Sequence, residues 1–83
     1  MLQIYSKANC QYCDMAKNLL KSKGVAYTEV RIDQDDAARN FLISEGHRAV
    51  PQIYQDGKLF VQGGYQGLAK MTDEELKAAH VHQ

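Results

Sequence analysis

The two cysteines of the chain, Cys10 and Cys13, stand two residues apart in the stretch Lys7-Ala8-Asn9-Cys10-Gln11-Tyr12-Cys13. At the first turn of a helix, two thiols with this spacing approach closely enough to form and release a disulfide. The N–H groups of a helix start have no partner within the helix, and they stabilise a thiolate placed there. The stretch therefore predicts redox chemistry at a dithiol.

The order of the two cysteines predicts their roles. Cys10 comes first and is expected at or just outside the helix start, where it is more exposed than Cys13, one turn inside. The helix dipole lowers the pKa of a thiol at that end, and Lys7 in the preceding loop is expected to lower it further. We expect Cys10 to attack the target disulfide and Cys13 to resolve the mixed disulfide that results.

Two other interpretations of the cysteine pair are a structural disulfide and part of a zinc site. A structural bridge that closes so short a loop would restrict the unfolded chain little. A zinc site would need ligands from His47, His80 and His82, the last two of which stand near a chain end, and the sequence has no second C-x-x-C motif. We expect no metal, with a zinc-binding module as the alternative outside redox chemistry.

Length and composition limit the classes of partner. A chain of 83 residues is expected to form one domain, 1–83, and its ten basic residues balance its ten acidic ones. Bulk charge therefore gives no indication of nucleic-acid or membrane binding. Residues 1–7 contain no long apolar run, and no later segment approaches membrane-spanning length. We expect a cytoplasmic monomer, in a reducing compartment where paired cysteines are more often catalytic or metal-binding than structural.

Hydrophobic periodicity predicts the elements that position the dithiol. Strands are expected at residues 2–5, 25–32, 51–54 and 58–62, and helices at 12–23, 37–45 and 73–80, with a further short helix at 65–70. Gly24 and Gly46 are expected to end the first two helices. Asp56-Gly57 predicts a tight hairpin turn, and the capping-box pattern from Thr72 to Glu75 predicts the start of the last long helix.

The resulting order is β-α-β-α-β-β-α. A helical crossover favours a parallel pairing of the first two strands, and the tight turn at Asp56-Gly57 makes the last two antiparallel. We therefore expect an α/β fold with a small mixed sheet covered by helices. Pattern alone leaves the order of the strands open.

Three motifs in register carry a resemblance over nearly the whole chain: a strand followed by Cys10-Gln11-Tyr12-Cys13, then Ala49-Val50-Pro51, then Gly63-Gly64-Tyr65. Together they resemble a glutaredoxin of the thioredoxin superfamily. The resemblance implies a thioredoxin-like fold with a four-stranded sheet in the order 2-1-3-4 and a cis proline at Pro51 that faces the dithiol. It also implies an enzyme that reduces protein disulfides and glutathione mixed disulfides with electrons from glutathione, with ribonucleotide reductase among its protein partners.

The same resemblance implies which residues contact glutathione or the substrate. Tyr12 would line the groove that binds glutathione. The backbone of Ala49 and Val50 would pair with the substrate, and the N–H groups of Gly63 and Gly64 would receive the γ-glutamyl carboxylate of glutathione. The full implied set is Lys7, Tyr12, Ala49, Val50, Pro51, Gly63, Gly64 and Tyr65. Lys7, His47 and Arg48 are candidate cationic contacts for the carboxylates of glutathione or for an acidic surface of a partner.

Departures from the family pattern leave a second function open. Gln11 replaces the usual proline, Ala49 the usual threonine, and Gln66 the aspartate that meets the glutathione ammonium. The missing acid and Gly46-His47-Arg48 resemble glutaredoxin-like redoxins, which are reduced by thioredoxin reductase and serve ribonucleotide reductase. Tyr12, Val50 and the paired glycines favour a glutaredoxin. An iron–sulfur cluster shared between two chains is a further alternative, which the second cysteine disfavours.

Overall fold

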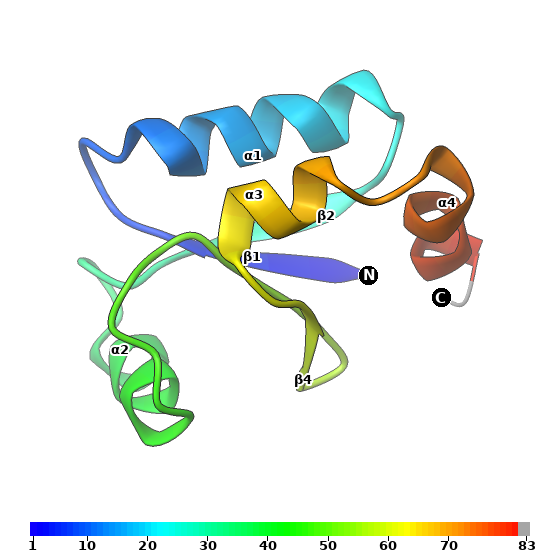
Figure 1. Cartoon of the computed structure of the whole chain (residues 1–83). Coiled ribbons are helices and arrows are strands. Elements are labelled where there is room, and N and C mark those ends of the chain that lie inside the picture. The colour runs from blue at the N-terminus through cyan, green and yellow to red at the C-terminus, as the bar shows by residue number, and fades with distance from the viewer. Residues whose placement is uncertain (82–83) are drawn as a thin grey trace.

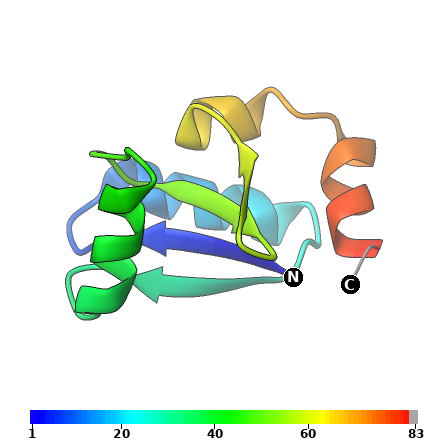
Figure 2. The same ribbon diagram turned by 90° about the horizontal axis from the view of Figure 1, so that it is seen from below.

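The computed structural model contains a four-stranded sheet with helices on both faces (Figure 1). It describes residues 1–81, with the side chains of residues 1–77. The elements are β1 (Leu2–Ser6), α1 (Gln11–Ser22), β2 (Tyr27–Arg31), α2 (Asp36–Ser44), β3 (Gln52–Gln55), β4 (Lys58–Val61), α3 (Gly64–Ala69) and α4 (Asp73–Val81). Helices α1 and α3 cover one face and α2 the other, whereas α4 lies at the end of the sheet where β1 begins (Figures 1 and 2).

The sheet has the strand order β2-β1-β3-β4, which confirms the predicted 2-1-3-4 arrangement. Strand β1 is parallel to β2 and antiparallel to β3, and β3 and β4 form the predicted antiparallel hairpin. Asp56 and Gly57 both adopt positive φ, 53° and 80°, as a two-residue hairpin turn requires. The central strand β1 leads directly to the cysteines, and its neighbours hold it on both sides.

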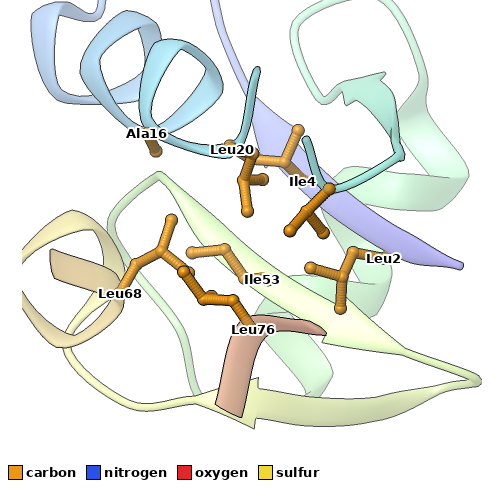
Figure 3. Close-up of a cluster of buried hydrophobic side chains, with 8 residues drawn as sticks. Leu2, Ile4, Ala16, Leu20, Ile53, Leu68 and Leu76 are labelled. Carbon is orange, nitrogen blue, oxygen red and sulfur yellow. The ribbon is translucent and has the colours of Figure 1, made fainter. Parts of the chain in front are cut away.

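The main hydrophobic core lies between the sheet and the helices α1 and α3 (Figure 3). Its buried members are Leu2, Ile4, Ala16, Leu20, Val25, Ile53, Leu68 and Leu76. A smaller cluster under α2 contains Tyr5, Ala38, Leu42 and Tyr54. Successive side chains of a strand point to opposite faces, so β1 contributes to both clusters. The buried face of α1 includes Ala16 and Leu20, and the buried face of α2 includes Ala38 and Leu42.

The second strand is shorter than predicted, and Val25 explains the difference. Residues 25–32 were expected to be a strand, but β2 covers Tyr27–Arg31. Val25 is 4% exposed and its N–H donates to the carbonyl of Leu20, so it closes the end of α1 over the main core. A β-branched residue after Gly24 can either begin a strand or fill a buried position at the end of a helix, and composition does not distinguish these two roles.

Side chains cap the helices as the sequence indicates. The N–H of Thr72 donates to Oε1 of Glu75 at 2.9 Å, and the N–H of Glu75 donates to Oγ1 of Thr72 at 3.1 Å. This reciprocal pair is the predicted capping box at the start of α4. Asp35 caps α2 in a similar way, because its Oδ1 accepts from the N–H of Ala38 at 3.1 Å.

Asp33 joins the loop before Cys10 to the end of β2. Its Oδ2 accepts from the N–H of Ala8 at 3.2 Å, and Arg31 donates to both of its carboxylate oxygens, at 2.9 and 2.7 Å. The hydrogen bonds from Arg31 are the main cause that lowers the pKa of Asp33 to about 2. A carboxylate stabilised in this way fixes the position of the loop that leads to the dithiol.

We predict that Asp33→Asn destabilises the fold in a pH-dependent manner. The pKa of Asp33 is lower in the folded chain than the value of about 3.9 expected when unfolded, so its contribution is present above that pH and is lost as the pH falls through about 2. Urea unfolding should show a gap between wild type and variant at neutral pH that narrows between about pH 4 and pH 2.

Asp56→Asn is the matched control, because it removes another exposed carboxylate and asparagine tolerates the positive φ at that turn. If the gap for Asp33→Asn changed with pH no more than the gap for Asp56→Asn, the role assigned to the Asp33 carboxylate would be wrong.

Candidate active site

The dithiol lies at the start of α1, and the sulfur of Cys10 caps that helix. Cys10 is the N-cap residue, with extended backbone angles, and its Sγ accepts a hydrogen bond from the N–H of Cys13 at 3.2 Å. The two sulfurs are joined as a disulfide, with the Cα atoms 5.2 Å apart. Helix-start N–H groups otherwise lack partners, so after reduction the same donor faces the sulfur of Cys10 and favours its thiolate form.

The two cysteines differ in exposure, as the sequence predicts. Cys10 is partly exposed, whereas Cys13 is 0% exposed because it lies on the same face of α1 as the core residues Ala16 and Leu20. Cys10 is therefore the more accessible sulfur of the pair. The sulfur of Cys13 is within reach of Cys10 but is shielded from outside partners.

An ion pair holds α1 against the sheet one turn after Cys13. The buried hydroxyl of Ser6 donates to Oε2 of Glu29 at 2.6 Å, and Nζ of Lys17 donates to the same oxygen at 2.9 Å. The hydrogen bond from Ser6, followed by that from Lys17, lowers the pKa of Glu29, and the bond to Glu29 raises the pKa of Lys17. The network joins β1, β2 and α1, so it fixes the helix start relative to the sheet.

The segment before β3 faces the dithiol across a cis peptide bond at Val50–Pro51. The cis bond agrees with what the resemblance implies. Sγ of Cys10 lies 3.9 Å from the carbonyl oxygen of Val50, so the first cysteine and this segment are in contact. The side-chain amide of Gln52 donates to the carbonyl of Ala49 at 2.8 Å and helps to hold the segment in place.

A cavity of about 300 Å³ opens between this segment and the start of α3, and we call it the Pro51 groove. It is lined by Tyr12, Ala49, Val50, Pro51, Gln52, Gly63, Gly64, Tyr65 and Gln66. The structure thus brings together every residue in the implied glutathione set except Lys7. Gln52 was not identified from the sequence, because no motif marks it.

Tyr12 lies at the groove and not in the core. Its side chain is 53% exposed, and its ring centre is 6.1 Å from that of Tyr65. The resemblance implies a place for Tyr12 at the groove, and the ring lies there in the structure. The two aromatic rings form one wall of the Pro51 groove.

The paired glycines allow α3 to begin against the Pro51 segment. Gly63 and Gly64 have φ of 88° and 58°, a conformation that glycine adopts without the steric cost of a side chain. A Cβ on Gly64 would lie 2.7 Å from the carbonyl oxygen of Pro51. The close approach of α3 to the Pro51 segment therefore requires a residue without a side chain at position 64.

A second and larger cavity, of about 580 Å³, shares Ala49 and Val50 with the Pro51 groove, and we call it the α2 groove. Its lining is Lys7, Ile32, Arg39, Leu42, Ile43, Gly46, His47, Arg48, Ala49 and Val50. The structure places Lys7, His47 and Arg48, the candidate cationic contacts, in this groove. Arg39 and Ile43 were not identified from the sequence, since they have the ordinary helix periodicity of α2.

His47 is engaged by the core beneath it. Its Nε2 lies 2.8 Å from the hydroxyl of the fully buried Tyr54, which also donates to Oε1 of Glu45 at 3.4 Å. Burial is the main cause that raises the pKa of Tyr54. These contacts hold the segment after α2 in place. They also engage the ring of His47, one of the histidines that a zinc site would need as a ligand.

The side chains of His80 and His82, the other histidines of the zinc interpretation, lie outside the described residues. In the part of the chain that the structure describes, no three histidine, cysteine or acidic residues are grouped as metal ligands would be. Over the same part, no helix has the length and apolar character needed to cross a membrane.

Comparison with known proteins identifies the family. The glutaredoxin family model matches residues 2–60. Glutaredoxin 3 of Escherichia coli (strain K12) is 45% identical over 58 residues, which cover 69% of this chain and 70% of that protein. The glutaredoxin-like protein NrdH of Lactococcus lactis subsp. cremoris is 35% identical over 72 residues, which cover 87% of this chain and all of that protein.

The crystal structure of a buckwheat glutaredoxin–glutathione complex is also similar to this chain. It superposes with a TM-score of 0.77 at 30% identity, covering 98% of this chain and 76% of that one. The agreement extends over β1 to α4, so it supports the thioredoxin-like fold as a whole.

We predict that Gly64→Ala destabilises the protein by about 2–3 kcal/mol, because its Cβ meets the carbonyl of Pro51 and its backbone keeps a positive φ. Gly24→Ala is the matched control: its φ is also positive, at 70°, but nothing lies within 4 Å of its Cβ, and we expect a cost of about 1 kcal/mol. Urea unfolding measures both. Equal losses would show that the contact with Pro51 is unimportant.

Proposed function

The chain belongs to the glutaredoxin family of thiol–disulfide oxidoreductases, and we propose that this member passes electrons from glutathione to protein disulfides and to glutathione mixed disulfides. The observation that supports this most is the position of the sulfur of Cys10, which caps α1 and touches Val50 at the edge of the Pro51 groove. A reactive thiol beside a groove of about 300 Å³ suits a small peptide that carries a sulfur.

The first step of the proposed reaction is attack by Cys10. Its thiolate attacks one sulfur of the substrate disulfide, a new bond forms between that sulfur and Sγ of Cys10, and the second substrate sulfur leaves as a thiolate that takes up a proton. The N–H of Cys13 stabilises the attacking thiolate. The burial of Cys13 directs the attack to Cys10.

In the second step, Cys13 gives up its proton and attacks Sγ of Cys10. This forms the Cys10–Cys13 disulfide and releases the remaining substrate sulfur as a thiol, so two electrons have passed from the protein dithiol to the substrate. The structure contains this oxidised product state. Two molecules of glutathione then reduce the protein disulfide again. The first attacks Cys10, forms a mixed disulfide with it and frees the thiol of Cys13. The second attacks the sulfur of the bound glutathione, so that the two leave together as glutathione disulfide and the thiol of Cys10 is restored.

The proposed seat for glutathione is the Pro51 groove. Its γ-glutamyl carboxylate would face the N–H groups of Gly63 and Gly64, and its backbone would pair with that of Val50, next to Cys10. Lys7, in the adjoining α2 groove, would receive the carboxylate at the other end. The similar buckwheat protein has been solved with glutathione, which supports this placement. The same proposal describes the protein as a cytoplasmic monomer with no resident metal.

A second candidate is a redoxin that takes electrons from thioredoxin reductase and delivers them to ribonucleotide reductase. Two observations favour it. The chain is 35% identical to the Lactococcus NrdH protein over that protein's full length. In addition, Gln66 lines the Pro51 groove where a carboxylate would be needed to pair with the glutathione ammonium. Both candidates use Cys10 and Cys13 in the same roles.

We predict fast turnover of a glutathione mixed disulfide when glutathione and its reductase supply the electrons. Gln66→Asp should lower the KM for the mixed disulfide about threefold or more, because the new carboxylate would pair with the glutathione ammonium. Steady-state assays with either glutathione or thioredoxin reductase as donor make the measurement. Turnover with thioredoxin reductase alone would move the chain to the redoxin class.

Cys10→Ser is the control for both assays, because no other exposed thiol exists among the residues of this chain. It should lose all exchange with either donor. Activity retained by this variant would mean that Cys13 is the attacking thiol, contrary to both candidate functions.

A further inference from the structure

The segment that faces the dithiol has no regular secondary structure of its own. Residues 47–50 lie between α2 and Pro51 and form neither helix nor strand. The carbonyl oxygen of the last of them, Val50, lies 3.9 Å from Sγ of Cys10, and in the proposed seat the backbone of Val50 pairs with glutathione. Because no ladder of backbone hydrogen bonds fixes such a segment, its position depends on the contacts that anchor its ends.

His47 anchors the start of this segment to two elements. Its N–H donates to the carbonyl of Leu42 at 2.9 Å, directly after Gly46 with its φ of 86°, which is the closing hydrogen bond of a helix end. Its ring meets the ring of Tyr54 edge-on, with the centres 5.8 Å apart and the planes at 90°. The backbone of His47 is thus held by α2, and its side chain is held by β3.

Tyr54 provides a rigid point of attachment. It is 0% exposed, and its ring packs edge-on against the rings of Tyr5 and Phe41, with the centres 5.5 and 5.2 Å apart. Its strand, β3, is paired on both sides, with β1 and with β4. The ring contacts and the two neighbouring strands therefore fix the direction in which the hydroxyl of Tyr54 points.

The hydrogen bonds of this hydroxyl have a definite direction. The hydroxyl carries one proton and donates it to Oε1 of Glu45 at 3.4 Å. Its oxygen then accepts, so Nε2 of His47, at 2.8 Å, is the donor to it. Burial, followed by the charge of Glu45, raises the pKa of Tyr54, so the hydroxyl keeps its proton at neutral pH. The three side chains form one chain of donors, from His47 through Tyr54 to Glu45.

We propose that the hydrogen bond between His47 and Tyr54 sets the affinity for the substrate, because it holds the backbone of Val50 where a glutathione mixed disulfide pairs with it. Both are positioning residues: Tyr54 is buried and acts on the substrate only through His47 and the segment that follows. The proposal rests on the proposed function, which supplies the partner for Val50. Without this hydrogen bond the segment occupies its binding position for part of the time, and the apparent affinity falls by that fraction.

The test measures how fast the reduced protein reacts with the mixed disulfide of glutathione and cysteamine, in the absence of other thiols. The dependence of the rate on substrate concentration gives a half-saturation concentration and a limiting rate. Cystamine, a small disulfide without a peptide backbone, reports the reactivity of Cys10 itself. Because no reductase or free glutathione is added, the choice of electron donor does not affect the result.

We expect Tyr54→Phe to raise the half-saturation concentration about fivefold and to leave the limiting rate and the rate with cystamine unchanged. His47→Phe should have the same effect, and the double variant should be no worse than either single variant, because both residues act through one hydrogen bond. His47→Gln should restore most of the affinity, since its amide is a donor without a charge. His47 is partly exposed, so its variants carry the test even if Tyr54→Phe does not fold.

Tyr5→Phe is the matched control, because it removes a hydroxyl from the same cluster and keeps both His47 and Tyr54. Equal effects of Tyr5→Phe and Tyr54→Phe would overturn the proposal, as would losses that add up in the double variant or a fall in the limiting rate alone. A loss in His47→Gln as large as in His47→Phe would make His47 a direct cationic contact instead. These results would leave the proposed function standing.

A different result would overturn the proposed function as well. A wild-type protein that reacts with cystamine but not with the glutathione mixed disulfide would have no use for glutathione at the Pro51 groove. The hydrogen bond between His47 and Tyr54 would then have no substrate affinity to set, and both proposals would be wrong.

Discussion

The hydrogen bond from the N–H of Cys13 to the sulfur of Cys10 is the interaction on which the function of this fold depends. It makes the sulfur of a cysteine the cap of a helix, a place usually taken by the side-chain oxygen of serine, threonine or aspartate. The cap needs a helix that begins at residue 11 and a strand that ends shortly before it. The central position of β1, the Ser6–Glu29–Lys17 network and the tether from Asp33 to Ala8 all hold that junction in place.

The second constraint is the close approach of three separate segments around the sulfur. The start of α1, the segment before β3 and the start of α3 meet because Val50 contacts Cys10 and Gly64 packs against the carbonyl of Pro51. Segments far apart in the chain thus form the two grooves, and each groove has a different character. The Pro51 groove has aromatic and backbone walls, whereas the α2 groove combines an apolar base with cations. The aromatic and backbone walls are the basis for assigning glutathione to the Pro51 groove.

Much of the fold followed from local patterns because those patterns have local causes. The capping box at Thr72, the hairpin turn at Asp56-Gly57 and the apolar face of α1 each depend on residues within a few positions of one another. The strand order and the cis bond at Pro51 depend on contacts between distant segments, and they were available only through the resemblance to a family. The predicted length of β2 was wrong because Val25 packs into the main core at the end of α1 instead of joining the strand.

The same distinction applies to the site. Spacing marked Cys10 and Cys13, and the family motifs marked the lining of the Pro51 groove. Arg39, Ile43 and Gln52 had no motif, because their positions beside the dithiol arise only when α2 and the Pro51 segment fold together. Lys7 was expected with the other glutathione contacts, and it lies in the α2 groove, at the far side of Val50 from the paired glycines. The residues of α2 follow ordinary helix periodicity, and this pattern gives no indication of the groove that they line.

The role of the helix cap is tested by the pKa of the Cys10 thiol in the reduced protein, measured from the rate of alkylation by iodoacetamide as a function of pH. A Cys13→Ser variant limits the reaction to one cysteine. We expect a pKa well below the value of about 8.5 of an ordinary thiol, because the helix start and its N–H donor stabilise the thiolate. A pKa at or above that value would show that the cap does not activate Cys10.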